Sequence, residues 1–432
     1  MSIMKTLETR NGELYLGGAS VSKLAKKYGT PLYLMDEGEI RANCMRYESA
    51  MRKYYGENAI VLYASKAFSC KAVYRTVRDC GLGCDVVSGG ELYTALAAGM
   101  EPEKIFFHGN NKTEAEIREA LTAGVGRIVL DSGFELGTVD RIAAELGVTA
   151  RVSVRIKPGI DAHTHDFIAT GKIDSKFGVA LENGEAIAFI GEILKAPHTE
   201  LCGLHCHIGS QIFDTRPFVR AAEVMMDFIA EIRDTYGYTV RELNVGGGVG
   251  IKYLDSHDPL TIEENVKNTA EAVLAAAERC GIPAPRLCME PGRSIVGDAG
   301  LTVYTVGSVK EIKNVRNYAS VDGGMTDNPR FALYEAAYEA VLPCRPDAER
   351  DTVYTVAGRC CESGDILIRD ITLPKLTPGE LLCVLSTGAY NYSMASNYNR
   401  VPRPPVVFIR NGEDRMVVRR ETYADVMAKD LD

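Results

Sequence analysis

The sequence lacks the features that mark membrane, secreted and nucleic-acid-binding proteins. No apolar run approaches the roughly 20 residues of a membrane span, and the opening segment MSIMKTLETRNGELYLGG has no apolar core of a secretory signal. The net charge is −9, from 49 basic and 58 acidic residues, and lysine and arginine form no basic stripe. We therefore expect a cytoplasmic protein that binds neither nucleic acid nor a membrane.

The cysteines are numerous, but they lack the spacing of a disulfide framework or of a zinc site. The 12 cysteines are scattered, and Cys202, Cys206, Cys288 and Cys383 lie inside apolar, strand-like runs. No CxxC pair is followed by a matching second pair. We expect reduced thiols and no structural zinc.

What the sequence does contain is a repeated pattern of strand followed by helix. Eight short apolar runs occupy residues 59 to 293, and each is followed by a helix-like stretch. The pattern is typical of a parallel (β/α)8 TIM-type barrel, whose active site lies at the C-terminal ends of the strands. The ends of the eight runs carry, in chain order, Lys66, Asp85, His108, Asp131, Arg155, His207, the glycines Gly246, Gly247 and Gly248, and Glu290 with Arg293. We expect these residues to face one pocket.

The length and the texture of the C-terminal part predict a second domain. A chain of 432 residues exceeds a typical single domain. After residue 293 the segments are strand-like and rich in valine, isoleucine, tyrosine and threonine. We predict a barrel domain over residues 38–293 and an all-β domain formed by residues 1–37 with 294–432.

Local signals add detail to this prediction. Asn411-Gly412 suits the type I′ turn of a β-hairpin. Capping boxes that begin at Thr113 and Thr261 mark the starts of two helices. Residues 158–177, rich in glycine, histidine and aspartate, are a candidate lid over the barrel.

The strand-end residues leave several chemical interpretations open. Lys66 is either one half of a salt bridge at the barrel mouth or a nucleophilic amine. GGGVG at residues 246–250 is either a phosphate cup or a tight turn, and Ile251 stands where a dinucleotide fingerprint needs glycine. The His163/His165 and His205/His207 pairs, with Glu290 or Asp85, would suit a metal.

A lysine, a phosphate cup, an imidazole and an acid together favour pyridoxal phosphate over a metal. The lysine would hold the cofactor as an aldimine and the glycines would hold the phosphate. A carboxylate such as Glu290 would keep the pyridine nitrogen protonated, so that the ring can accept an electron pair. We therefore predict pyridoxal 5′-phosphate as the cofactor and no metal.

Eight longer motifs carry a resemblance to a known family. In chain order they are YASKAF, CDVVSGGEL, HGNNK, GLHCHIGSQ, NVGGGVG, EPGR, CESGD and GAYN. Over about residues 10–425 the chain resembles the diaminopimelate decarboxylases, which are pyridoxal-phosphate-dependent decarboxylases of the alanine-racemase fold. The resemblance implies a barrel with a β domain, and a homodimer whose active sites are shared between subunits.

The resemblance also implies roles for individual residues. Lys66, His207 and Cys361 would be catalytic, with Cys361 as the proton donor. The cofactor would be bound by Lys66, Asp85, His207, Ser210, Gly247, Gly248, Glu290, Pro291, Gly292, Arg293 and Tyr390. The substrate would be bound by Arg293, Arg330, Tyr334, Glu362 and Tyr390. Cys361 and Glu362 would come from the second subunit, with a Lys176–Asp365 pair across the interface.

The reaction implied is decarboxylation of meso-2,6-diaminopimelate to L-lysine and CO2, the last step of lysine biosynthesis, through an aldimine and a quinonoid intermediate. One alternative is a decarboxylase of the same fold that acts on another basic amino acid, of the ornithine, arginine or carboxynorspermidine type. A second alternative is a pyridoxal phosphate carrier without turnover. Ser153 and Lys157 differ from the residues that related sequences often show near Arg155.

Overall fold

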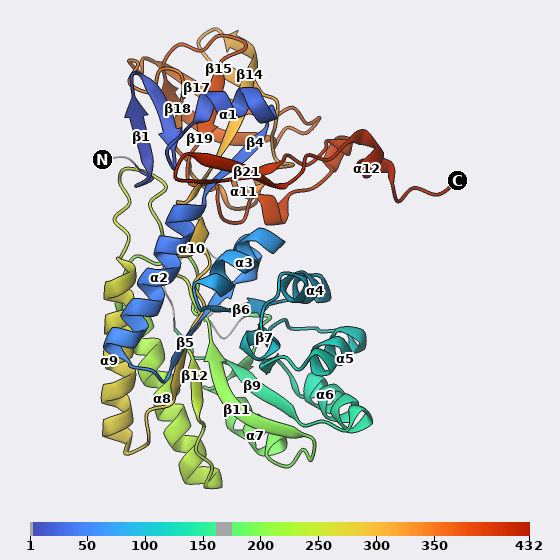
Figure 1. The fold of residues 1–432 in the computed structure, drawn as a ribbon. Coiled ribbons are helices and arrows are strands. Elements are labelled where there is room, and N and C mark those ends of the chain that lie inside the picture. The colour runs from blue at the N-terminus through green and yellow to red at the C-terminus, as the bar shows by residue number, and fades with distance from the viewer. Residues whose placement is uncertain (1–2, 161–174) are drawn as a thin grey trace. The chain divides into compact units, whose positions relative to one another are not determined.

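The computed structural model describes residues 3–160 and 175–432 (Figure 1). The chain divides into two compact units, which we call the barrel unit and the β unit. The barrel unit comprises Asn43–Gly250 and Pro259–Ser294, and the β unit comprises Met1–Ala42, Ile251–Asp258 and Ile295–Asp432. Positions 161–174 of the candidate lid, with His163 and His165, lie outside the described residues.

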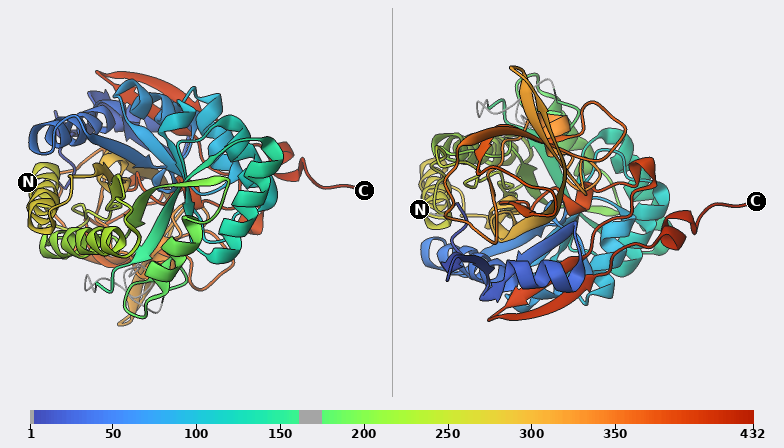
Figure 2. Two further views of the ribbon diagram at one scale, coloured as in Figure 1. Left: turned by 90° about the horizontal axis from the view of Figure 1, so that it is seen from below. Right: turned by 90° about the horizontal axis from the view of Figure 1, so that it is seen from above.

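The strands of the barrel unit close into a parallel ring, which confirms the fold predicted from the repeated pattern (Figure 2, left). The ring consists of β5 (Ala59–Ala64), β6 (Gly83–Val86), β7 (Ile105–Phe107), β8 (Arg127–Leu130), β9 (Ala150–Lys157), β11 (Thr199–Cys206), β12 (Glu242–Asn244) and β13 (Arg286–Met289). Pairing of β13 with β5 closes the ring. A short strand, β10 (Val179–Ala180), pairs with the end of β9.

Helices surround the ring and connect successive strands (Figure 2, left). They are α3 (Lys71–Asp79), α4 (Gly89–Ala97), α5 (Glu114–Ala123), α6 (Gly133–Leu146), α7 (Glu185–Ile193), α8 (Arg216–Tyr236) and α9 (Ile262–Cys280), and α2 (Glu37–Tyr54) leads into β5. Both predicted capping boxes are present, at Thr113 before α5 and at Thr261 before α9. Each satisfies backbone N–H groups that a helix start otherwise leaves without partners.

Apolar side chains inside the barrel join the paired strands β13 and β5 to β7, which lies one strand further round the ring beyond β6. Ile60 and Leu62 of β5 share one face of their strand, because residues two apart point the same way. They form a buried cluster with Phe106 of β7 and Cys288 of β13. Burial of such side chains, worth about 1.5–3 kcal/mol each, favours the closed ring and fixes the register in which its strand ends meet.

The β unit is built on a nine-stranded sheet. Its main path runs β18 (Ile366–Leu373), β17 (Thr352–Ala357), β15 (Arg316–Val321), β14 (Gly300–Ile312), β4 (Leu32–Asp36), β20 (Val406–Arg410) and β21 (Glu413–Val418), and β19 (Leu381–Val384) joins β14 to β16 (Ala340–Val341). The strands β1 (Leu7–Arg10), β2 (Glu13–Leu16) and β3 (Ala19–Ser20) form a small separate sheet before α1 (Val21–Tyr28). The strand β4 lies between β14 and β20, so an N-terminal segment is part of the larger sheet.

Two short helices and one tight turn complete the β unit. The helices are α11 (Arg330–Tyr334) and α12 (Tyr423–Met427), and α10 (Arg293–Val296) links the two units along the chain. The turn between β20 and β21 has positive φ at Asn411 (52°) and Gly412 (81°), as a type I′ turn requires. No helix within the described ranges is long and apolar enough to cross a membrane. None of the twelve cysteines forms a disulfide.

Candidate active site

The barrel unit presents most of the predicted cofactor residues at the C-terminal ends of its strands. Lys66 lies in the single 3-10 turn Ser65–Ala67 that follows β5, and Asp85 lies in β6. His207 follows β11, the glycine segment follows β12, and Glu290 follows β13. Ends of parallel strands meet on one face of a barrel, so this placement gathers the residues at one mouth.

Lys66 differs from the expectation in its exposure. The sequence suggests a lysine at a buried strand end, whereas β5 ends at Ala64 and the side chain of Lys66 is exposed. Its neighbour Asp85 is buried and accepts a hydrogen bond from Ser65 N at 3.1 Å. Burial and the nearby Glu290 carboxylate raise the pKa of Asp85 well above its ordinary value, while the charge of Lys66 opposes the shift.

Glu290 is buried, and its carboxylate lies beside nitrogen atoms of three residues at the ends of β7, β11 and β12. His108 Nε2 and Asn244 Nδ2 each lie 2.7 Å from Oε1, and His205 Nε2 lies 3.2 Å from Oε2. Burial would raise the pKa of Glu290, but the two histidines hold it well below its ordinary value. Burial lowers the pKa of His205 to about 4, so this ring is neutral at pH 7. The hydrogen bonds that Oε1 accepts also favour the ionised carboxylate.

The glycine segment fits between the loops that follow β11 and β13 because it has no side chains. A Cβ on Gly247 would lie 2.1 Å from the carbonyl oxygen of Glu290, and one on Gly248 would lie 2.4 Å from that of Gly209. Gly248 also has a φ of 119°, which side-chain-bearing residues rarely adopt. Backbone N–H groups of such a segment can approach a phosphate closely.

The remaining predicted cofactor residues of the barrel unit lie beside this segment. Ala64 N donates to Pro291 O at 3.0 Å, and a Cβ on Gly292 would meet Ala64, so the EPGR loop packs against the end of β5. Arg293 Nη2 donates to Ser210 Oγ at 2.9 Å. Burial, followed by the charge of Lys66, lowers the pKa of His207 well below its ordinary value and keeps the ring neutral.

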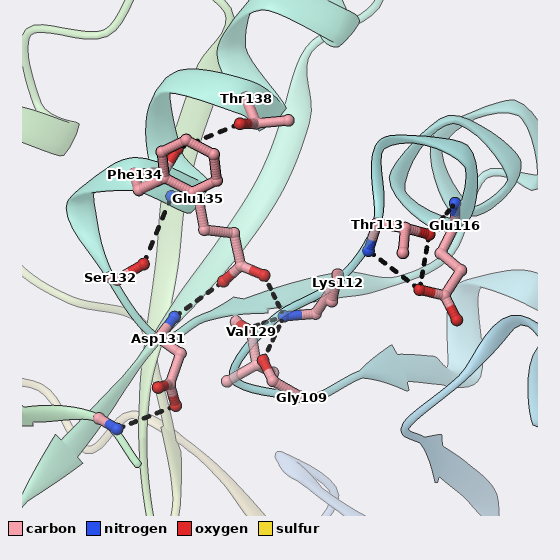
Figure 3. Close-up of polar contacts among 11 residues, drawn as sticks. Gly109, Lys112, Thr113, Glu116, Val129, Asp131, Ser132, Phe134, Glu135 and Thr138 are labelled. Carbon is pink, nitrogen blue, oxygen red and sulfur yellow. Dashed lines mark hydrogen bonds and ion pairs between the residues drawn. The ribbon is translucent and has the colours of Figure 1, made fainter. Parts of the chain in front are cut away.

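A buried ion pair holds the loop that follows His108 (Figure 3). Lys112 Nζ donates to Glu135 Oε1 at 2.8 Å, to Val129 O at 2.7 Å and to Gly109 O at 2.9 Å. Glu135 Oε2 accepts from Asp131 N at 2.9 Å. Burial lowers the pKa of Lys112, and the charge of Glu135 opposes that shift. The network ties together the segments that follow β7 and β8, and Lys112 stands four residues after His108 in the chain.

The barrel-unit residues fit pyridoxal phosphate. A primary amine, a glycine cradle that a Cβ would fill, a neutral imidazole and an ionised buried carboxylate are the groups that this cofactor needs. The same face contains one cluster with the donors of a metal site, in which ligand atoms of His108, His205 and Glu290 lie within 4.8 Å of one another. His207 and Asp85, which the sequence offered as metal ligands, are not part of that cluster.

The predicted substrate residues lie in the β unit, apart from Arg293. Arg330 is buried, and its Nη1 donates to Tyr338 OH at 2.6 Å. Its guanidinium carbon lies 5.1 Å from the ring centre of Tyr253 and 5.5 Å from that of Tyr338. Within the described residues Arg330 forms no ion pair with a carboxylate. Tyr334, at the end of α11, is half-buried, as is Tyr390.

Cys361 and Glu362 are exposed on a loop that Asp365 anchors. Asp365 accepts from Met325 N and Cys360 N, each at 2.6 Å, and is itself 3% exposed. Both carboxylate oxygens therefore have partners within one chain. The Lys176–Asp365 pair expected across an interface does not agree with this buried, internal role of Asp365.

The sequence alone did not identify several residues that make these sites. Asn244 stands two residues before the glycine segment, and Tyr253 and Tyr338 lie far apart in the chain. The sequence pattern suggests His205 only as a metal ligand and His108 only as a strand-end residue. The signal for His205 is its spacing of two residues from His207, which the alternation of side chains along a strand would direct to the same side.

Comparison with known proteins identifies the family. Residues 37–297 match the model described as pyridoxal-dependent decarboxylase, pyridoxal binding domain. The diaminopimelate decarboxylase of Bacillus subtilis (strain 168) is 50% identical over 424 residues, which are 98% of this chain and 96% of that protein. The structure of diaminopimelate decarboxylase from M. jannaschii in complex with L-lysine has a TM-score of 0.92 at 38% identity, covering 100% of this chain and 99% of that one.

A lysine/ornithine decarboxylase from Vibrio vulnificus complexed with putrescine has a TM-score of 0.76 over 90% of this chain and 97% of that one. Its identity of 22% shows the fold alone. The close relatives confirm the resemblance found in the sequence motifs, the fold that it implied and the cofactor. The chain belongs to the diaminopimelate decarboxylase family of pyridoxal-phosphate-dependent decarboxylases.

Proposed function

We propose that this carboxy-lyase converts meso-2,6-diaminopimelate to L-lysine and CO2 in the cytoplasm, as the last step of lysine biosynthesis. The observation that carries the choice of substrate is Arg330. Its buried guanidinium lies beside two tyrosine rings without a carboxylate partner among the described residues. A buried cation of this kind is costly unless an anion binds it, and the distal carboxylate of diaminopimelate supplies one. Ornithine and arginine have no distal carboxylate.

Residues of the barrel unit would hold the cofactor. Lys66 Nζ would hold it covalently, the glycine segment and Ser210 would bind its phosphate, and His207 would lie against its ring. When bound, pyridoxal phosphate supplies an electron sink for the pair left as the bond between Cα and the carboxylate breaks. Glu290 would keep a proton on the ring nitrogen, because its own pKa is held well below its ordinary value.

Residues of the β unit would bind the distal end of the substrate and return a proton. Arg330 would bind the distal carboxylate in the bidentate manner that suits a guanidinium, with Tyr334 beside it on α11. Glu362 would bind the distal ammonium. After CO2 leaves, the Cys361 thiol would give its proton to Cα. A reducing compartment suits an exposed thiol with this task.

We further infer that the enzyme is a homodimer with shared sites. Cys361 and Glu362 are exposed on the CESGD loop of a single chain, which leaves them accessible to a second subunit. Each site would then combine the Lys66 of one subunit with the Cys361 of the other. The family relation and the exposure of this loop support the proposal.

The test is a product measurement on the purified enzyme loaded with pyridoxal phosphate. L-lysine and CO2 should form in equal amounts from meso-diaminopimelate, with little product from L-ornithine or L-arginine. Turnover of ornithine, arginine or carboxynorspermidine in preference to diaminopimelate would favour the same-fold alternative. Cofactor binding without any product would favour a carrier.

A further inference from the structure

The carboxylate of Glu290 is held by residues outside the expected cofactor set. We propose that His108 and Asn244 are positioning residues that keep this carboxylate ionised and in one orientation, with Oε1 engaged by the protein and Oε2 kept for the ring nitrogen of the cofactor. The inference rests on the proposed function, because it takes the ring nitrogen as the partner of Glu290.

The two oxygens of Glu290 have unequal surroundings. Oε1 lies 2.7 Å from both His108 Nε2 and Asn244 Nδ2. Because an ionised carboxylate only accepts, His108 must carry its proton on Nε2. His205 Nε2 lies 3.2 Å from Oε2, and neither nitrogen of this ring has a hydrogen-bond partner among the described residues. The protein therefore saturates one oxygen and leaves the other available.

Asn244 connects Glu290 to the glycine segment. Its Oδ1 accepts from Gly246 N at 2.9 Å, so its Nδ2 must be the atom that faces Glu290. Glu290 N in turn donates to Gly246 O at 2.8 Å. The Asn244 side chain thus fixes the position of the Glu290 carboxylate relative to the glycine segment. A bound cofactor would contact Glu290 through its ring nitrogen and the glycine segment through its phosphate.

His108 is placed by strand pairing and by the buried ion pair. His108 N donates to Val86 O at 2.8 Å, and the ring packs edge-on against His205 with centres 4.7 Å apart. Four residues later, Lys112 fixes the loop through Glu135 and two carbonyl groups (Figure 3). The donor to Oε1 therefore sits on a segment anchored at both ends.

Other charged groups near Glu290 also affect the ionisation of its carboxylate. Asp85 of β6 repels the Glu290 carboxylate, and Arg155 of β9 attracts it. Burial also opposes the charge. The charge interactions of His108 and His205 with the carboxylate nevertheless hold the pKa of Glu290 well below its ordinary value, and the two 2.7 Å hydrogen bonds at Oε1 favour its charged form.

A metal ion held by His108, His205 and Glu290 is the competing interpretation. Two ligands of a tetrahedral zinc at ~2.05 Å would lie ~3.4 Å apart. The 2.7 Å between His108 Nε2 and Glu290 Oε1 is instead a hydrogen-bond distance. The geometry favours a proton between these atoms over an ion.

The test uses pyridoxal 5′-phosphate labelled with 15N in the ring, bound to the wild type and to variants and observed by NMR without substrate. In the wild type the ring nitrogen should show the shift of a protonated pyridine between pH 6 and 9, and Glu290→Gln should supply the unprotonated reference. His108→Leu and Asn244→Asp should move toward that reference. In His108→Gln, whose amide nitrogen can occupy the place of Nε2, the protonated shift should return.

Kinetics provide a second measure. In His108→Leu kcat should fall on the order of 10-fold to 100-fold, as is common when an orienting partner of a functional group is lost, while KM changes little. Cys288→Ala, which removes a buried contact of β13 without touching the carboxylate, is the stability control. It should lower the melting temperature but leave the 15N shift unchanged.

Two results would overturn the proposal. One is a protonated 15N shift with kcat within twofold of wild type in both His108→Leu and Asn244→Asp, which would leave these residues only a structural role. The other is one zinc per wild-type chain that is lost in His108→Leu. Because the NMR measurement needs no substrate, absence of diaminopimelate turnover would refute the proposed reaction without deciding this inference.

Discussion

Replacing Lys112 by methionine tests whether the buried network around its ammonium group stabilises the barrel. The Lys112 side chain is 1% exposed, and its ammonium group donates to Glu135 and to the carbonyl groups of Gly109 and Val129. Methionine has a similar length and volume but cannot donate. The substitution therefore removes a charge and three hydrogen bonds while it leaves the packing largely intact.

The expected loss of stability follows from the polar groups that Lys112→Met leaves buried without a partner. Glu135, whose side chain is 5% exposed, loses its cation, and removal of one partner of a buried ion pair costs about 3–5 kcal/mol. Each carbonyl left without a donor adds about 1–3 kcal/mol, although the terms overlap when water enters. We expect a loss of about 4–6 kcal/mol in the free energy of unfolding. The double variant Lys112→Met/Glu135→Gln also removes the unpaired buried charge, so it should regain about half of the lost free energy of unfolding.

The assay is urea unfolding followed by far-UV circular dichroism, because the chain has no tryptophan to report fluorescence. The matched control is Lys104→Met. Lys104 Nζ lies 3.1 Å from Glu101, and both side chains are partly exposed, at 37% and 62%. That loss should be about 0–1 kcal/mol. If Lys112→Met stays within about 1 kcal/mol of the wild type, or if the double variant is less stable than the single one, the buried pair does not stabilise the barrel.

Four further predictions address the site and its surroundings. Borohydride reduction should fix the cofactor to Lys66, and Lys66→Ala should lose both this link and activity by several orders of magnitude; a label on another lysine would contradict the assignment. Arg330→Lys keeps the positive charge but loses the planar guanidinium that can bind a carboxylate through two hydrogen bonds. In steady-state assays KM for diaminopimelate should therefore rise about 10-fold to 100-fold, with a smaller change in kcat. An unchanged KM would refute this role of Arg330. Burial raises the pKa of Asp327 from 3.8 to about 7, so the free energy of unfolding falls as the pH rises from about 4 to about 7. In thermal unfolding, Asp327→Asn should be as stable as the wild type near pH 4 and more stable by about 2–4 kcal/mol near pH 8. Equal stability of the two proteins at both pH values would contradict the shift. Lys66→Ala and Cys361→Ala proteins, allowed to exchange subunits, should recover up to roughly a quarter of wild-type activity, and no recovery despite exchange would place both residues in one chain.

The sequence predicts features that depend on short-range patterns. The strand–helix repeat, the capping boxes at Thr113 and Thr261 and the Asn411-Gly412 turn each involve residues a few positions apart, and the structure confirms all of them. The acid after β13 also follows from a local pattern, since each strand end of a barrel faces the same mouth.

The sequence does not predict contacts that depend on how distant strands align. His108 and Asn244 meet Glu290 only because β7, β12 and β13 close into one ring with a particular register. The exposure of Lys66 depends on β5 ending two residues earlier than its apolar run suggests. Such alignments are set by packing of the whole barrel and leave no mark at a single position.

Two buried cations, Lys112 and Arg330, differ in a way that separates stability from binding. Lys112 has its counter-ion, Glu135, within the chain. Arg330 has Tyr253 and Tyr338 beside it but forms no ion pair within the described residues. Removal of Lys112 therefore leaves the Glu135 carboxylate buried without its cation. Removal of Arg330 leaves no buried carboxylate unpaired, and it removes the free-energy cost of burying a guanidinium. If replacing Lys112 lowers the free energy of unfolding and replacing Arg330 does not, then Lys112 serves stability and Arg330 serves ligand binding. Binding sites are commonly less stable than they could be, because their function requires groups that are costly to bury.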